Sequence, residues 1–326
     1  MTSGAVARQC QRLQCVSRFF DCARIDQAVS AAESHPSALS SPRVLVPLAL
    51  AGVYLIWGST YLAIRIGIES YPPFLMAAIR FPIAGALMYA FLRWRGVAPP
   101  TRRQWFNCLV TASLLLGLGN GLVCYAEQTV PSGIAAVAVA SVGLFMAIFA
   151  GLYGHWPNRL EWLGLVVGFA GVVVLNLGNG LRSSPLGAAA LVLASIGWAY
   201  GSIWSRHRDM PAPTMGAAAQ MLCGGIPLGL MALATGERFA HIPSLHATLA
   251  LAYLIVAGSI LGFTAYIYLL HNVRPALATS YAYVNPPVAV LVGVVLGGEA
   301  VHALDIAGTI VILAGVVAIT LAKTKR

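Results

Sequence analysis

Long stretches without charge dominate this sequence of 326 residues and limit how it can fold. Nine such runs occur, at 44–64, 104–126, 128–158, 162–181, 183–205, 210–236, 239–273, 275–298 and 306–322. A tenth apolar segment surrounds a single arginine, Arg80. Most of the ten reach the ~20 residues that an α-helix needs to cross ~30 Å of hydrocarbon. The pattern predicts a chain that crosses a membrane many times.

Composition agrees, since 59% of the residues are hydrophobic, 9% are charged and the mean hydropathy is +0.79. Soluble domains carry about 25% charged residues. The alternating runs of about ten residues that are typical of outer-membrane barrels are absent from the sequence. We therefore predict an all-α polytopic membrane protein with ten transmembrane helices.

The distribution of basic residues explains the net charge of +10. If the N-terminus is cytoplasmic, sixteen of the twenty Lys and Arg residues fall in the tails and inside loops, and three fall outside: Arg65, Arg182 and Arg238. Such a bias orients a membrane protein with the positive loops inside. We expect an integral protein of the cell (inner or plasma) membrane with both termini on the cytoplasmic side. We expect no nucleic-acid partner.

The second half of the chain repeats the first. "LEWLGLVVGFAGVVVL" at 160–175 aligns with "LDIAGTIVILAGVVAI" at 304–319, and Trp57 matches Trp198, at offsets of 141–144 residues. Five helices in each unit make the second unit enter the membrane from the opposite side. The sequence therefore predicts two inverted five-helix repeats, 44–181 and 182–322, around a central cavity near the midplane.

The two ends of the chain lie outside the repeats. Residues 1–43 contain no continuous apolar core, so we expect a disordered and dispensable extension rather than a signal peptide. A basic helix on the membrane surface and an organellar presequence are the alternatives. Residues 323–326 form a short basic tail.

Several motifs then resemble a known family. "WGSTYLAIRIGIESYPPFLMAAIRF", "PSGIAAVAVASV", "ALATSYAYVNPPVAVLVG" and the closing "GGE" occur from about residue 45 to 322. They are similar to the EamA group of the drug/metabolite transporter superfamily, in particular its YedA-type inner-membrane proteins. The resemblance implies ten helices as two inverted five-helix units, and transport of small metabolites, amino acids among them. Small relatives couple to protons through a glutamate in the first helix, but the first helix predicted here, 46–67, has no acid.

Arg80 is the most informative polar residue, because it stands about eight residues inside an apolar helix. An arginine at the centre of a membrane helix costs roughly +2.5 to +3.5 kcal/mol on insertion scales, so it should face the interior. Its guanidinium can hold a substrate carboxylate or phosphate through two parallel hydrogen bonds. The alternative is a structural arginine satisfied by helix-end carbonyls or by one acid.

Other candidates for the substrate site are polar or aromatic. Glu127, at the outer boundary, could pair with Arg80, act as a protonatable gate, or be a solvated helix end. Asn285 precedes Pro286 and Pro287, where we expect a kinked helix and a freed carbonyl. The complete set of candidates for substrate binding is Arg80, Trp57, Asn120, Glu127, Trp198, Tyr281 and Asn285.

These features favour a secondary transporter that works by alternating access, with export as the expected direction. We expect no cofactor and no metal, since HExxH, GxSxG, Walker A and Rossmann motifs are absent from the sequence. The partners expected are a small-molecule substrate and the lipid bilayer, with ion or proton coupling and the oligomeric state left open. An intramembrane enzyme or a sensor is the alternative, but the sequence offers neither a second acid–base cluster nor a soluble signalling domain.

Overall fold

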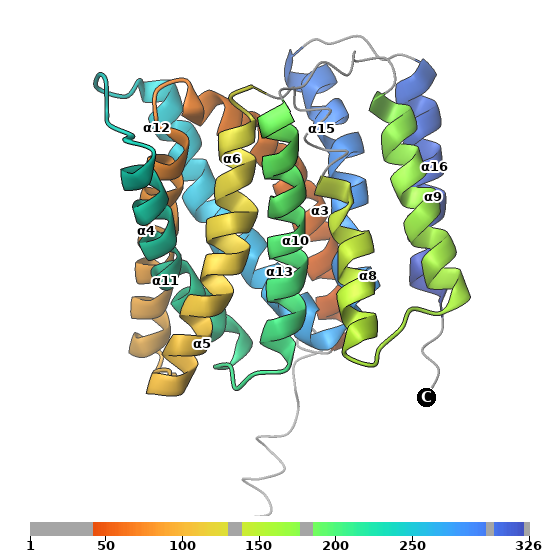
Figure 1. Cartoon of the computed structure of the whole chain (residues 1–326), viewed down its shortest axis with the longest axis horizontal. Helices are drawn as coiled ribbons and strands as arrows, with labels where there is room; N and C mark the ends of the chain where they lie inside the picture. The colour runs from red at the N-terminus through yellow and green to blue at the C-terminus, as the bar shows by residue number, and fades with distance from the viewer. Residues whose placement is uncertain (1–41, 130–138, 177–184, 298–302, 323–326) are drawn as a thin grey trace, which may run out of the picture. The chain divides into compact units, whose positions relative to one another are not determined.

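The structure is a computed structural model that describes residues 42–129, 139–176, 185–297 and 303–322 (Figure 1). The chain divides into two units, residues 1–47 and 48–326. Of the first unit, the structure describes only 42–47, which begin the first helix. The predictions for residues 1–43 and for the tail at 323–326 therefore lie outside the described residues, apart from positions 42 and 43. The described residues from 48 onward belong to the second unit.

Every regular element in these described ranges is a helix. Two long helices contain a π-helical segment, η2 in the first half and η3 in the second. The bounds are α3 Pro42–Ile68, α4 Pro73–Trp94, α5 Arg102–Ala112, η2 Ser113–Gly121, α6 Leu122–Ala126, α8 Val142–Leu152, α9 Arg159–Asn176, α10 Pro185–Arg206, α11 Pro213–Ala234, α12 Leu245–Tyr253, η3 Leu254–Phe263, α13 Thr264–Asn272, α14 Pro275–Ala278, α15 Tyr281–Gly297 and α16 Ala303–Leu321.

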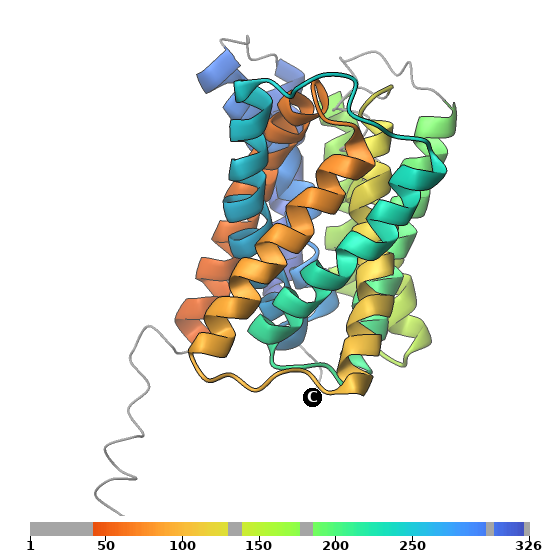
Figure 2. The same ribbon diagram turned by 90° about the vertical axis from the view of Figure 1, so that its left-hand side faces the viewer.

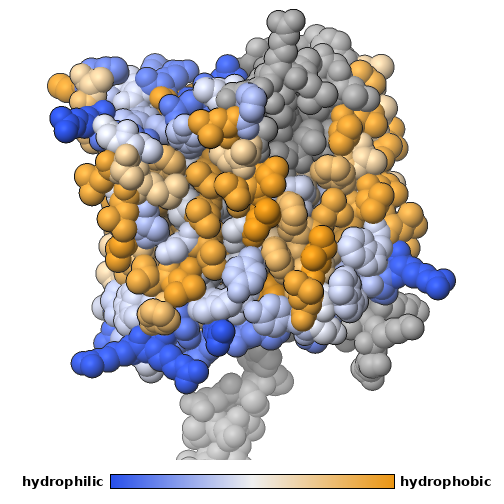
Figure 3. Space-filling view, viewed as in Figure 1, coloured by the Kyte–Doolittle hydropathy of each residue, from blue (hydrophilic) through white to orange (hydrophobic). Residues whose placement is uncertain are grey.

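Among the residues that the structure describes, six helices are long and apolar enough to cross a membrane, judged by length and composition. They are Val44–Ile68, Pro73–Trp94, Arg102–Ala126, Pro185–Arg206, Pro213–Ala234 and Leu245–Asn272. The predicted all-helical membrane class is confirmed, whereas the count of ten crossings stays a prediction. Figure 3 shows hydrophobic side chains across the middle of one face and hydrophilic ones gathered toward its upper and lower edges, as expected where lipid meets water.

Local signals start and end these helices where the sequence provides them. α4 and α11 each begin with a proline, Pro73 and Pro213, whose missing N–H costs nothing in the first turn. Both helices end just before a glycine with positive φ, Gly96 at 81° and Gly236 at 69°, which only glycine adopts without strain. The carboxylate of Glu237 accepts hydrogen bonds from two backbone amides at the start of α4, which fixes that helix end.

α4 and α11 pack side by side, as Figure 2 shows, through contacts that mirror each other. A Cβ added to Gly85 would lie 2.6 Å from the backbone nitrogen of Leu222, and one added to Gly225 would meet the ring of Pro82. Numbers rise along α4 while they fall along α11, so the two helices run antiparallel. The two contacts exchange positions 140 residues apart, as they would across a two-fold axis.

α9 and α16 also pack through contacts in which equivalent residues of the two helices exchange places. A Cβ on Gly164 would lie 2.7 Å from the carbonyl oxygen of Gly315, and one on Gly171 would lie 3.1 Å from that of Gly308. Gly164 was aligned with Gly308, and Gly171 with Gly315, so the partners again exchange. The glycines of α9 and α16 therefore let the two helices approach at backbone distance.

Candidate functional site

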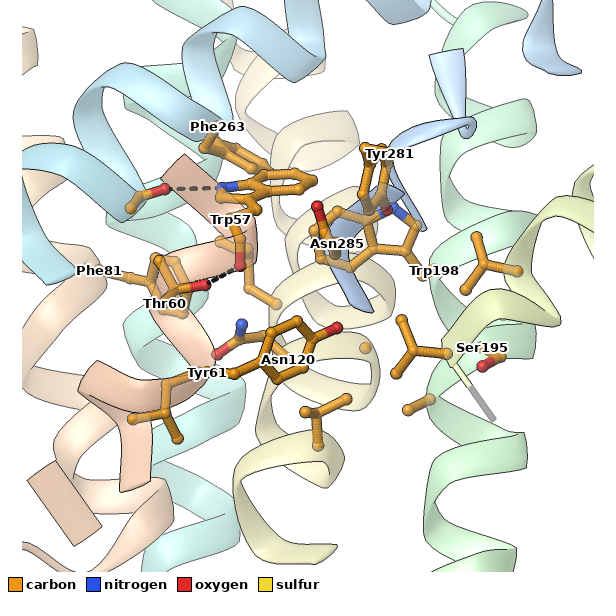
Figure 4. A pocket seen from close by; sticks show the side chains of 18 of the residues that line it. Trp57, Thr60, Tyr61, Phe81, Asn120, Ser195, Trp198, Phe263, Tyr281 and Asn285 are labelled. Atoms are coloured by element: carbon orange, nitrogen blue, oxygen red, sulfur yellow. Dashed lines mark hydrogen bonds between the residues drawn. The ribbon is translucent and has the colours of Figure 1, made fainter. Parts of the chain in front are cut away.

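A cavity of about 90 Å³ lies between helices of both halves of the chain (Figure 4). α3, α4, α6, α8, α10 and α15 contribute to its wall, together with the two π-helical segments. Its lining residues are Trp57, Thr60, Tyr61, Ile64, Arg80, Phe81, Leu116, Gly119, Asn120, Val123, Val139, Val142, Ala194, Ser195, Trp198, Gly258, Phe263, Tyr281 and Asn285. Figure 4 shows the labelled side chains of this set projecting from several helices toward the same space.

Two residues of the cavity wall, Arg80 and Asn120, can be placed along the length of the helix bundle. Arg80 lies seven residues after the start of α4, and Asn120 lies six residues before the end of α6. At 1.5 Å per residue, both lie about 10 Å from the end of the bundle where α4 begins and α6 ends. These two residues of the cavity wall therefore lie nearer to this end of the bundle, which the distribution of basic residues predicts to be the outer one.

Arg80 is 4% exposed and lines this cavity. Its Nε donates to the Ser259 hydroxyl at 2.8 Å, and its guanidinium carbon lies 4.8 Å from the centre of the Phe81 ring. Its Nη1 atom is buried and has no hydrogen-bond partner. Nη2 lies where a Cβ on Gly258 would be 2.7 Å away, so the glycine makes room for the guanidinium. The ion pair that a structural arginine could have formed with an acid is not seen: Arg80 forms no ion pair with any described residue.

Four aromatic rings form a layer beside the cavity. Trp57 lies at the centre, with ring centroids 4.7 Å from Tyr281, 5.3 Å from Tyr266 and 5.6 Å from Trp198. Its indole nitrogen donates to the Gly258 carbonyl at 3.0 Å. The indole nitrogen of Trp198 donates to the Tyr266 hydroxyl, also at 3.0 Å. Because both indole N–H groups are satisfied within the protein, the layer offers a substrate mainly apolar and π surface.

Two glycines admit the matched tryptophans. A Cβ on Gly119 would lie 2.7 Å from the Trp198 ring, and one on Gly262 would lie against the Trp57 indole nitrogen. Each tryptophan thus packs on a glycine of a π-helical segment in the other half of the chain. Offsets of 141 and 143 residues relate the tryptophans and the glycines, so this contact is reciprocal as well.

Two amide side chains bring hydrogen-bonding groups to the wall. Asn285 is 2% exposed, lies beside the Tyr61 hydroxyl, and its Oδ1 has no hydrogen-bond partner. Asn120 accepts from the Cys124 thiol at 3.6 Å through its Oδ1. α15 continues through Pro286 as a helix, and the described break lies earlier, at 279–280 between α14 and α15. Neither proline has an amide hydrogen to donate to the carbonyl four residues earlier, at 282 or 283.

Glu127 does not line the cavity, although it was predicted among the site residues. It follows the last residue of α6 and is close enough to Arg65 and Tyr61 to interact electrostatically with both side chains. Its Oε1 is buried without a hydrogen-bond partner. Burial raises the pKa of its carboxyl group to about 8, against the opposing effect of Arg65. Pairing with Arg80 is not observed; a proton-binding role stays a prediction.

The structure thus brings six of the seven candidates to one cavity: Arg80, Trp57, Asn120, Trp198, Tyr281 and Asn285. Sequence reasoning missed Ser259, which orients the guanidinium, and Tyr266, which joins the aromatic rings. A serine inside the apolar run 254–263 was the available signal for the first. Within the described ranges, no three His, Cys, Asp or Glu residues are placed to hold a metal ion.

Comparison with known proteins decides the family. The model of the EamA-like transporter family matches twice, over residues 45–177 and 185–321. The chain belongs to the EamA-like transporter family. It is 48% identical over 284 residues to the uncharacterised inner membrane transporter YedA of Escherichia coli (strain K12), covering 86% of this chain and 93% of that protein. This chain is therefore a membrane transporter, as its resemblance implied.

One more distant relative and one solved structure are also similar to this chain. A probable amino-acid metabolite efflux pump of Salmonella typhimurium (strain LT2) is 27% identical over 284 residues, covering 81% of this chain and 90% of the pump. A solved crystal structure superposes with a TM-score of 0.71 at 23% identity, covering 85% of this chain and 97% of that one. The latter likeness shows that the fold is shared.

Proposed function

We propose that this EamA-family protein is a secondary transporter that exports small amphipathic metabolites with a carboxylate, amino acids among them, by alternating access. The proposal rests on the surroundings of Arg80. A buried guanidinium with an unpartnered Nη1 lines a cavity whose other walls are aromatic and amide groups. A substrate carboxylate would complete its hydrogen bonds, since an unmet buried donor costs about 1–3 kcal/mol. The name of the Salmonella relative, which refers to amino-acid metabolites, supports this substrate class.

The wall suits an amphipathic ligand in two further ways. Oδ1 of Asn285, which has no partner, can accept a hydrogen bond from an ammonium or amide group. The rings of Trp57 and Tyr281 offer an apolar surface for the rest of the molecule. Together these groups favour a zwitterion with an apolar side chain over a simple inorganic anion.

Alternating access follows from two inverted repeats, which we propose are 44–181 and 182–322. Antiparallel packing of α4 against α11 and of α9 against α16, with contacts that exchange between the halves, supports this proposal. The double family match supports it too. Exchanging the conformations of the two units would close the outer cavity and open an equivalent one on the inside.

The test is substitution of Arg80. Arg80→Gln should reduce transport of an anionic substrate by about 100-fold, because a charge-assisted hydrogen-bond pair is lost, with little change in the amount of inserted protein. Arg80→Lys keeps the charge but loses the planar fork, so affinity should fall less. Flux and protein level would be measured in cells challenged with toxic amino acids and their analogues, which would also identify the substrate.

A structural arginine predicts another result. The Arg80→Gln protein would then be degraded or misassembled, or be rescued by the additional change Glu127→Gln. Normal flux in Arg80→Gln would overturn the proposed role.

Orientation can be tested separately. With both termini cytoplasmic and ten crossings, alkaline phosphatase fused after residue 182 should be active, and after residue 207 inactive, because the enzyme folds only outside the cytoplasm. The expected contrast rests on the excess of basic residues in the proposed inside loops. The reverse pattern of activity would require the opposite orientation.

A further inference from the structure

α4 and α11 correspond residue by residue. Pro73 and Pro213 start the two helices, and Gly96 and Gly236 follow their ends, each pair separated by 140 residues. The same offset aligns "PFLMAAIRF" at 73–81 with "PTMGAAAQM" at 213–221. In this alignment the counterpart of Arg80 is Gln220.

The correspondence also holds in space. Gly85 contacts Leu222, and Gly225 contacts Pro82, so equivalent positions meet equivalent partners. At 100° per residue, position 80 lies about 200° around α4 from position 82, and position 220 lies about 200° around α11 from position 222. Arg80 and Gln220 therefore occupy the same place on the two helices, on the side away from the contact between them.

Both side chains are buried with a polar atom unsatisfied. Gln220 is 1% exposed and its Oε1 has no hydrogen-bond partner, as Nη1 of Arg80 has none. Gln220 does not line the cavity that contains Arg80. Buried polar groups of native proteins nearly always have partners, and a group without one calls for an explanation. Packing does not explain it, because an apolar side chain of similar size would fill the site without the penalty.

We propose that Gln220 lines the substrate cavity in the inward-facing form, as Arg80 does in the form seen here, and hydrogen-bonds the substrate there. The inference rests on the proposed alternating-access function. When the two halves exchange conformations, α11 takes the environment that α4 has now. The amide then donates to the substrate carboxylate through Nε2 and accepts from its ammonium through Oε1. Because the amide is neutral, it holds an anion less tightly than Arg80.

Cysteine labelling tests this proposal without knowledge of the substrate. The full chain, with its six cysteines replaced by alanine, would carry Gln220→Cys or Arg80→Cys. A membrane-impermeant methanethiosulfonate reagent would be applied to right-side-out and inside-out vesicles. The thiol at 220 should react about tenfold or more faster from the cytoplasmic side, since it is buried in the outward-facing form and exposed only in the other. The thiol at 80 should show the opposite preference.

Two further variants complete the experiment. Ala218→Cys is the matched control, because Ala218 is fully buried on the opposite face of α11 against Gly85, and it should react from neither side. Gly216→Cys probes the face of Gln220 one turn earlier, where a Cβ has no neighbour closer than 3.5 Å. It should also react from the cytoplasmic side, and it replaces Gln220→Cys if that variant fails to fold.

The outcomes separate the two proposals. Reaction at 220 or 216 from neither side, or from the outside only, overturns the role of Gln220. Failure of position 80 to react from the outside, with position 220 reacting from the cytoplasm, contradicts the proposed outer cavity and leaves the inference on Gln220 standing. Gln220→Leu adds a second measurement: its melting temperature in detergent should equal or exceed that of the wild type, and a large decrease would assign Gln220 a structural role instead.

Discussion

Two regions of the molecule are built from matched helices and differ in what they bury. α9 and α16 meet through glycines at backbone distance, with Gly164, Gly171 and Gly315 against the main chain of the other helix. The centre instead places the buried Arg80 and Asn285, with two half-buried tryptophans, around open space. Membrane helices lack a hydrophobic drive to associate in lipid, so close backbone packing supplies much of the attraction.

The difference indicates that one region, the α9–α16 contact, stabilises the fold, whereas the other, the cavity, serves transport. The α9–α16 contact is close-packed, so added volume there must move a helix. The cavity is lined by buried polar atoms that have no hydrogen-bond partner, which lowers the stability of the fold. A bound ligand that supplies the missing hydrogen bonds would explain why such atoms are kept. Changes at α9–α16 should therefore affect the amount of folded protein, and changes around the cavity should affect transport.

The largest effect is expected from Gly315→Ala. Its new Cβ would lie 2.5 Å from the Gly168 nitrogen and 2.8 Å from the Gly164 oxygen, and backbone atoms cannot move aside without shifting the helix. Overpacking of this kind costs typically about 1–3 kcal/mol. We expect a strong decrease in inserted protein and in its melting temperature in detergent.

Two glycines serve as controls for that substitution. Gly52 and Gly229 have nothing within 4 Å of an added Cβ, and both lie inside helices. Alanine there should leave the melting temperature unchanged or raise it, because alanine favours a helix by about 0.5–1 kcal/mol over glycine. If Gly315→Ala is as stable as these two variants, the α9–α16 packing is not a source of stability.

A smaller effect, confined to transport, is expected from Gly258→Ala. The new methyl group would lie 2.7 Å from Nη2 of Arg80, which is the far end of a flexible side chain and can move. Displacing a binding group by about 1 Å can cost up to 10²-fold in rate, so we expect a tenfold to hundredfold loss of flux. The protein level should match that of Gly229→Ala. Full flux in Gly258→Ala would show that the position of this guanidinium does not matter.

Much of the fold was predictable because it depends on patterns along the chain. Charge-free runs identified the apolar helices. Trp57 and Trp198 stood at matched positions and did come together, with centroids 5.6 Å apart. Repetition in the sequence carried this information, since equivalent residues take equivalent places when two similar units pack around an axis.

The polar contacts of the site were not predictable in the same way. Ser259 binds Arg80 across 179 residues, and Tyr266 meets Trp198 through a hydroxyl that any buried tyrosine must satisfy. The partner of a buried donor is set by the approach of helices, which one helix cannot show alone. For the same reason Glu127 was predicted in the site. It follows the last residue of α6, four residues after Val123, and it does not line the cavity as Val123 does.

The smallest predicted effect concerns Glu127 and pH. Burial raises the pKa of its carboxyl group to about 8, so the folded protein holds a proton there that an unfolded chain loses near its ordinary value of about 4.5. Stability from this group is therefore present at acid pH and is lost as the pH rises through 8. Arg65, Tyr61 and Cys124 are the titratable neighbours that interact with the carboxylate.

Ionisation of Glu127 would also place a negative charge near the outer end of the cavity. Uptake of an anionic substrate into the outer site should then weaken modestly between pH 7 and pH 9, as the ionised share rises from about one tenth to about nine tenths. Glu127→Gln keeps the shape without the charge, so both its melting temperature and its flux should lose this pH dependence. The difference between wild type and variant, measured at matched pH, cancels the contributions of other titrating groups. Parallel pH profiles for the two proteins would show that Glu127 does not titrate between pH 7 and pH 9, which would contradict the raised pKa.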